Sequence, residues 1–257
     1  MNPLRFNRRN LLATAGALVL AGCDKLSQSP GATRTVSKAE GLNLTAQRAL
    51  IGRHALAREF TRADISKDFK ANGTIVPHDA DYKALMDGQF AAWSLVVDGL
   101  VENPLTLTLD QLKAEPARTQ ITRHDCVEGW SSIGEWTGAK LGDLLNKAKL
   151  KPEARYIVFH CLDTLADGAP DNTKGKYYES IDLVDAFHPQ TILAYQMNGQ
   201  PLPVPHGAPL RLRVERQLGY KQAKFIHRVE AVADFKAIGG GQGGFWEDRG
   251  YEWYAGI

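Results

Sequence analysis

Short apolar segments with a two-residue alternation are the feature that most constrains how this chain can fold. In LTLTL, Leu105, Leu107 and Leu109 alternate with threonines, which is the pattern of a half-buried strand. The segment YIVFH (156–160) is apolar up to its final histidine, as expected of a buried strand. In LRLRVE (210–215), leucines and a valine occupy one face and arginines the other. Many strands this short predict a fold dominated by β-structure.

Helical spacing occurs between these segments. Apolar residues recur at roughly helical spacing from 44 to 60 and again from 140 to 150, where the apolar face would consist of Leu141, Leu144, Leu145 and Ala148. Asp110 is a candidate N-cap for a short helix at QLKAEP. Residues 163–176 are polar and predict a solvated loop that contains Asp163, Asp167 and Asp171. With no repeat and no second boundary, we expect one α+β, β-rich domain over 44–257.

The N-terminal segment MNPLRFNRRNLLATAGALVLAGC predicts export rather than folded structure. A basic head precedes a short apolar run, and Leu20-Ala21-Gly22-Cys23 resembles the bacterial lipoprotein box. Arg8-Arg9 resembles a twin-arginine signal, which exports folded proteins. We therefore expect a signal over 1–22, lipidation of Cys23, a flexible tether over 23–43, and a location on the periplasmic side of the inner membrane. The alternative is an uncleaved anchor helix.

Charge excludes one class of partner. The formal net charge of +2 gives no strong basic field, so nucleic acid is not expected as a partner. Only three cysteines occur, too few for a disulfide scaffold.

The segment RHDCVEGW (123–130) leaves four interpretations of Cys126 open. With Cys23 lipidated, Cys126 and Cys161 could form a disulfide in an oxidising compartment. His124, Cys126, His160 and Cys161 could bind zinc, although their spacing is poor for it. Cys126 could be a nucleophile with His124 as its base, or a thiolate ligand for a soft transition metal. The folded-export signal favours the last interpretation.

Four segments together are similar to one enzyme family. They cover roughly residues 70–257 and read LVVDGLVENPLTLTLDQL, TRHDCVEGWSSIGEWTGAKLGDLL, LAYQMNGQPLPVPHGAPLRLRVERQLGYKQAKFI and GGFWEDRGYEWYAG. They resemble the sulfite oxidase superfamily of molybdopterin-dependent oxidoreductases, especially its small bacterial periplasmic members such as methionine-sulfoxide reductases. The resemblance implies a sulfite-oxidase-type molybdopterin-binding domain and a molybdenum–molybdopterin cofactor.

The resemblance also implies roles for individual residues. Cys126 matches the thiolate that binds molybdenum, and this soft sulfur donor is the implied catalytic ligand. Arg211 matches an arginine that holds the pterin phosphate. Lys224, with the backbone of Gln222 and Ala223, matches the other side of that phosphate site.

Three further positions match cofactor contacts. Asn72 lies in FKANG, where the family places a pterin-contacting asparagine. His206 stands where the bacterial reductase has asparagine, and Cys161 where a threonine contacts the cofactor. Substrate-binding roles are also expected within Arg123, His124, Asp125 and Glu128.

The implied function is transfer of an oxygen atom on or off a small substrate such as a sulfoxide or N-oxide. Sulfite-oxidising relatives typically continue into an immunoglobulin-like domain, whereas this sequence closes at Ile257 and contains no Cys-x-x-Cys-His haem segment. We therefore expect a single-domain subunit that exchanges electrons with a separate carrier, such as a membrane cytochrome. The alternatives are a sulfite-oxidising enzyme and, from another class, a disulfide-stapled lipoprotein that binds a ligand without catalysis.

Overall fold

The computed structural model describes residues 41–165 and 174–257, so the predicted signal, Cys23 and most of the predicted tether lie outside the described residues. The chain divides into two units between Ile51 and Gly52. In the first unit, residues 41–50 are helical. The helix predicted over 44–60 therefore ends at residue 50. The chain beyond Gly52 is not helical, and Glu59 forms a β-bridge with Thr122 instead.

The second unit contains the following helices and strands in chain order: η1 Arg62–Asp64, α3 Ala80–Asp87, β1 Ser94–Gly99, β2 Leu105–Thr108, α4 Leu109–Lys113, β3 Ala117–Asp125, β4 Ser131–Lys140, α5 Leu141–Ala148, β5 Tyr156–Thr164, β6 Lys176–Asp182, α6 Leu183–Ala186, β7 Ile192–Met197, β8 Gln200–Pro201, η2 Val204–His206, β9 Arg211–Arg213, η3 Gly219–Lys221, β10 Ile226–Val232 and η4 Glu247–Arg249. This confirms the predicted α+β, β-rich class. Within the described ranges, no helix is both long enough and apolar enough to cross a bilayer.

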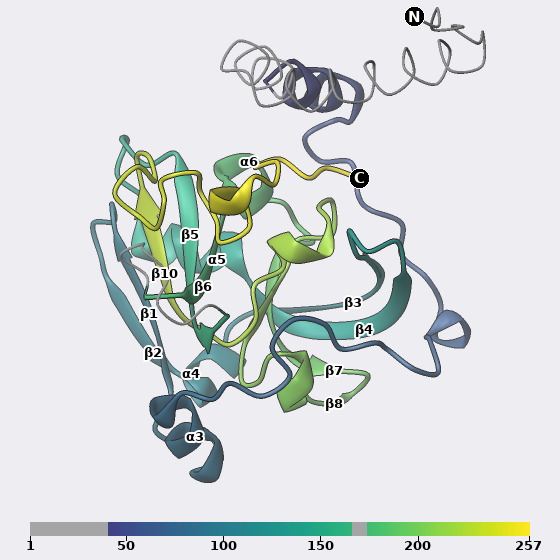
Figure 1. The fold of residues 1–257 in the computed structure, drawn as a ribbon, viewed down its shortest axis with the longest axis vertical. Helices are drawn as coiled ribbons and strands as arrows, with labels where there is room; N and C mark the ends of the chain where they lie inside the picture. The colour runs from purple at the N-terminus through teal and green to yellow at the C-terminus, as the bar shows by residue number, and fades with distance from the viewer. Residues whose placement is uncertain (1–40, 166–173) are drawn as a thin grey trace, which may run out of the picture. The chain divides into compact units, whose positions relative to one another are not determined.

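The first sheet has the strand order β2-β1-β10-β5-β6. Strand β10 lies between β1 and β5, parallel to β1 and antiparallel to β5 (Figure 1). Val229 of β10 pairs with Val97 on one side and Phe159 on the other, and all three side chains are buried. The strand predicted at 156–160 is confirmed and runs on to Thr164.

The second sheet has the order β3-β4-β7-β8, with β9 pairing with β7. Strands β3 and β4 form a long hairpin, from Ala117 opposite Ala139 to Asp125 opposite Ser131. The turn of this hairpin contains Cys126 and so holds it at the end of a rigid ladder. Gly138 permits β4 to lie close to β7, because a Cβ there would come within 2.2 Å of the Leu193 carbonyl oxygen.

Local patterns account for several elements. The apolar face predicted for residues 141–148 is buried as expected in α5. Leu105 and Leu107 are half-buried in β2 while the threonines between and after them are exposed. The helix after β2 is capped by Thr108, whose side chain accepts a hydrogen bond from the Gln111 backbone N–H, so Asp110 is not the N-cap. The N-cap lies two residues earlier than predicted, because Thr108 and Gln111 form a capping box.

Two predicted surfaces are buried instead. Arg211 and Arg213 do share one face of β9, but that face is covered, and both side chains are buried. Asp163, predicted in a solvated loop, lies in β5 and is only 3% exposed, because the strand continues three residues beyond Cys161. Asp167 and Asp171 lie outside the described residues.

Candidate functional site

A cavity of about 200 Å³ lies at the end of the β3–β4 hairpin. Its wall combines segments far apart in the sequence: residues 69–74, the end of β3 and its turn, β9, η3 with the residues after it, and the C-terminal segment. The side chains on this wall that bear on its chemistry are Asn72, His124, Cys126, Asp163, Tyr177, His206, Arg211, Gln222 and Lys224.

Strand alternation directs Cys126 toward this cavity. Along β3, Gln120, Thr122 and His124 are buried while the residues between them are less so, and Cys126 continues that face into the turn. The turn is closed by a hydrogen bond from the Cys126 N–H to the Trp130 carbonyl, 2.9 Å. The Asn72 amide donates to the Cys126 sulfur at 3.3 Å.

The structure contradicts two of the interpretations of Cys126, the disulfide and the zinc site. Cys126 and Cys161 are both free and buried, so the predicted disulfide alternative is not borne out. Among residues 41–165 and 174–257, no group of three or more His, Cys, Asp or Glu side chains could hold a metal ion, so the four-ligand zinc site is not formed. Cys126 is left as a free thiol that lines the cavity, either a nucleophile or a ligand for a soft metal.

Arg211 and Arg213 lie two residues apart in β9, but among the described residues only Arg213 has a carboxylate partner. Both guanidinium groups lie over the Trp136 ring, 4.9 and 4.5 Å from its centroid. Arg213 is neutralised by Glu215, which accepts from Nε at 3.0 Å and from Nη2 at 2.5 Å. Arg211 donates only to the carbonyl oxygens of His206 and Gln222, and its buried Nε has no partner within the described chain. Burial, followed by the charge of Arg213, lowers the pKa of Arg211 to about 9.

Lys224 is a second cation without a carboxylate partner in the described ranges. Its ammonium donates to three backbone carbonyls, those of Asn72, Thr74 and Pro205. Burial and the charge of Arg211 lower its pKa to about 7. The bonds to Asn72 and Thr74 tie residues 69–74 to Lys224 at the cavity. An anion that bound Lys224 would have to replace at least one of them.

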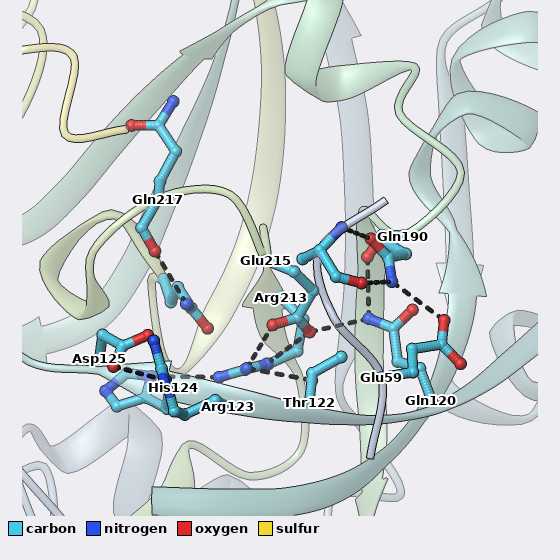
Figure 2. Close-up of polar contacts among 12 residues, drawn as sticks. Glu59, Gln120, Thr122, Arg123, His124, Asp125, Gln190, Arg213, Glu215 and Gln217 are labelled. Carbon is cyan, nitrogen blue, oxygen red and sulfur yellow. Dashed lines mark hydrogen bonds and ion pairs between the residues drawn. The ribbon is translucent and has the colours of Figure 1, made fainter. Parts of the chain in front are cut away.

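A buried polar network fixes the strand that precedes Cys126. Figure 2 shows Arg213 between Glu215 and His124. Because a guanidinium only donates, the Arg213 contact of 3.1 Å makes His124 Nδ1 an acceptor. Glu215 also accepts from Gln120, which in turn donates to the Gln190 carbonyl. Burial, then the charges of Arg213 and Arg211, holds the pKa of His124 well below its usual range.

The structure brings most of the predicted site residues together. Those that line the cavity are Asn72, Cys126, His206, Arg211, Gln222 and Lys224. Ala223 is buried behind the wall, where its carbonyl accepts from the Leu212 N–H. Cys161 is 1% exposed and borders a separate hollow with His160 and Arg228. The roles of all these residues as ligands or contacts of the cofactor stay predictions.

The substrate-binding candidates divide in two. His124 and Glu128 line the cavity. Arg123 and Asp125 pair with each other at 2.8 Å and are not part of its wall.

Sequence reasoning missed Asp163 and Tyr177 as parts of the wall. Burial raises the pKa of Asp163 to about 6. The alternation of YIVFHCLDT, extended past His160, places Cys161 and Asp163 on one buried face and could have indicated this.

The donor set fits an anionic cofactor that carries a soft metal. A thiol sits at one part of the cavity, and two basic side chains, Arg211 and Lys224, sit at another with no carboxylate partner among residues 41–165 and 174–257. The unpartnered Arg211 Nε is a buried donor that a phosphate oxygen would satisfy. Thiolate sulfur is the protein ligand that suits a soft metal.

Comparisons with known proteins agree with this chemistry. The family model described as "Oxidoreductase molybdopterin binding domain" matches residues 82–237. The chain is 40% identical over 166 residues to a putative protein-methionine-sulfoxide reductase subunit, YedZ1, of Azospira oryzae, covering 65% of this chain and 56% of that protein. It is 34% identical over 241 residues to the protein-methionine-sulfoxide reductase catalytic subunit MsrP of Xanthomonas campestris, covering 88% of this chain and 70% of that protein.

A solved structure, the sulfane dehydrogenase SoxCD of Paracoccus pantotrophus, matches 56% of this chain and 39% of its own with a TM-score of 0.49 and 23% identity. The predicted superfamily and cofactor are confirmed by the family model and the relatives. This chain belongs to the molybdopterin-binding oxidoreductases of the sulfite oxidase superfamily, a family of molybdenum-dependent enzymes.

Proposed function

We propose that the protein is a reductase that removes the oxygen atom from sulfoxides, with methionine sulfoxide in polypeptides as the substrate. The observation that carries this proposal is the free Cys126 thiol, which receives the Asn72 N–H in a cavity that also holds Arg211 and Lys224. Relatives that are 34–40% identical are named protein-methionine-sulfoxide reductases, which supports the choice of substrate.

Each residue has a role that follows from its chemistry. Cys126 would hold molybdenum as a thiolate, with Asn72 stabilising the negative sulfur. Arg211 and Lys224 would hold the phosphate, and the low pKa values that they show without an anion would return toward normal beside one. When bound, the molybdenum cofactor supplies the two-electron oxygen-atom transfer. Overall, sulfoxide, two electrons and two protons give sulfide and water.

The mouth of the cavity suits a sulfoxide attached to a polypeptide. Val127, Leu165 and Tyr251 line the cavity and are exposed, although each is large and apolar. A free amino-acid sulfoxide would carry an ammonium and a carboxylate past these side chains. A methionine sulfoxide within a chain has neither charge, so its backbone and apolar neighbours can contact this rim.

We further propose that electrons come from a separate carrier at the membrane. The sequence supports this through Arg8-Arg9 and the tetrad that ends in Cys23, which predict folded export and a lipid tether on the periplasmic side of the inner membrane. Such a tether would keep the reductase close to a membrane cytochrome. Membrane fractionation of the wild type and a Cys23→Ala variant tests this location.

The function is tested with purified, molybdenum-loaded protein and a reduced dye as the electron donor. We expect turnover of an oxidised methionine-containing peptide, slower turnover of free methionine sulfoxide, and no turnover in Cys126→Ser. A Lys236→Gln variant, which changes an exposed charge, serves as the matched control. Rapid oxidation of sulfite with an oxidised dye, and no sulfoxide turnover, would assign the alternative direction.

A further inference from the structure

Three charged side chains lie together in the interior beside the cavity. Lys221 of η3 donates to Glu179 of β6 and to Glu247 of η4, each at 2.5 Å. The side chains of Lys221 and Glu179 are 0% exposed and that of Glu247 is 1% exposed. The three residues come from different elements, so their contact ties the C-terminal segment to the first sheet.

The cluster carries one more carboxylate than it has cations. In each carboxylate, Oε1 accepts from Lys221, and Glu179 Oε1 also accepts from the Ser180 N–H. The second oxygen, Oε2, is buried in both Glu179 and Glu247 and has no partner among the described residues. The backbone of Gly244 packs directly against the two carboxyl groups, since a Cβ there would lie 2.0 Å from Glu247 Oε2. One proton held between the two carboxyl groups would satisfy both oxygens and neutralise the cluster.

We propose that Glu179 and Glu247 share one proton and, together with Lys221, act as positioning residues that fix the aromatic wall of the substrate cavity. The part of this inference that concerns substrate rests on the proposed function. The shared proton does not.

The cluster is joined to the wall by short connections. Trp246, which lines the cavity, precedes Glu247 directly, and its ring lies 5.3 Å from that of Tyr251. Tyr220, which precedes Lys221, has its ring 5.2 Å from that of Tyr251. All three aromatic residues line the cavity. A displacement of Glu247 or Lys221 would therefore move the surface that contacts the substrate.

The surroundings of the cluster favour the protonated form. Burial, followed by the negative charge of Glu247, raises the pKa of Glu179 well above its usual range. Burial opposes the charge on Lys221, but the two carboxylates raise its pKa, so the ammonium is retained. Four neighbouring groups from β5, β6 and η3 are neutral at pH 7: Cys161, Tyr177, Tyr178 and Tyr220. The carboxyl group of Asp248 in η4 also lies nearby, where it accepts a hydrogen bond from the Tyr178 hydroxyl.

Infrared spectroscopy tests the proton without any turnover. At pH 7.5 we expect the wild type to show a carboxylic-acid C=O band that shifts in D₂O. The band should be lost in Glu179→Gln and in Glu247→Gln, because each leaves one carboxylate balanced by Lys221. It should remain in Glu153→Gln, which alters an exposed glutamate. Absence of the band in the wild type, or its persistence in both cluster variants, would overturn the shared proton.

Steady-state kinetics test the positioning role. In the wild type, loss of the proton at alkaline pH should raise KM for a sulfoxide peptide at least threefold while kcat changes little. In Glu247→Gln the cluster has no proton to lose, so KM should stay within about twofold of the neutral wild-type value across that range. An equal alkaline rise of KM in this variant would refute the positioning role. If sulfoxides are not turned over at all, the infrared result still decides the shared proton.

Discussion

Replacing Arg211 by Met should stabilise the cofactor-free protein while weakening its hold on the cofactor. Arg211 is buried over Trp136 without a carboxylate partner in the described chain. Methionine keeps an unbranched apolar stem in the same place and removes the unpaired charge. Arg213, two residues along β9, is the matched control, because Glu215 neutralises it in an otherwise similar setting.

The expected magnitude follows from two opposing effects. Burial, then the charge of Arg213, lowers the pKa of Arg211 from 12.5 to about 9, which corresponds to a cost of about 5 kcal/mol for the charged form. The substitution also removes hydrogen bonds of 3.0 and 3.4 Å to the His206 and Gln222 carbonyls, together about 3 kcal/mol. The net gain is about 2 kcal/mol, or roughly 4–8 °C in Tm for a domain of this size. Below pH 9 Arg211 is charged in both states, so the gain is fully present at pH 7.

Thermal unfolding of protein made without the cofactor measures this gain. The rise in Tm that the wild type and the variant each show when the cofactor is bound measures the affinity lost with the Arg211 contact to the phosphate. Arg213→Met should change stability in the opposite direction, by about 3–5 kcal/mol, because it leaves Glu215 buried and unpaired. If Arg211→Met lowers Tm as much as Arg213→Met does, the buried charge of Arg211 does not destabilise the cofactor-free protein, and the reasoning that assigns it to the phosphate is wrong.

Three further outcomes are expected. Cys126→Ser should reduce bound molybdenum to well below one atom per chain by elemental analysis, and unchanged metal content would exclude Cys126 as the ligand. Burial raises the pKa of Asp163 from 3.8 to about 6, so between these values the folded state binds a proton that the unfolded state releases. In denaturant titrations, the free energy of unfolding of the wild type relative to Asp163→Asn should therefore fall by about 3 kcal/mol as pH rises from about 4 to 7. Parallel pH curves for the two proteins would contradict this. Gly219→Ala should cost about 1–3 kcal/mol in the same titrations, because a Cβ would lie 2.5 Å from His124 Nε2, and a neutral result would show that the ring can move.

Elements whose pattern is local could be predicted from the sequence, and those set by distant partners could not. The buried face of α5 and the alternation in β2 depend on spacing alone, and both were predictable. The covered face of β9 depends on Trp136, which is about 75 residues earlier in the chain and stacks under both arginines. Nothing within LRLRVE indicates that contact. The helix predicted over 44–60 combined true helical spacing up to residue 50 with a non-helical segment after it.

In the candidate site, too, the identity of several residues could be predicted from local motifs, whereas their charge balance could not. Cys126, Arg211 and Lys224 could be assigned through motifs, and the structure places them around one cavity. The charge balance of the two arginines of β9 could not be read from the sequence, since it depends on Glu215, which accepts from Arg213 and not from Arg211. Cys161 matched the family pattern but borders another hollow.

The central place of β10 has a consequence for how the protein is made. Strands β1 and β5 do not pair with each other; each pairs with β10, which is synthesised more than 60 residues after β5 ends. A nascent chain that has not yet released residues 226–232 from the ribosome therefore has two half-sheets with open edges and no complete wall for the cavity. The first sheet can therefore close only after residues 226–232 have left the ribosome, and the cavity that would hold the cofactor can be completed only after that.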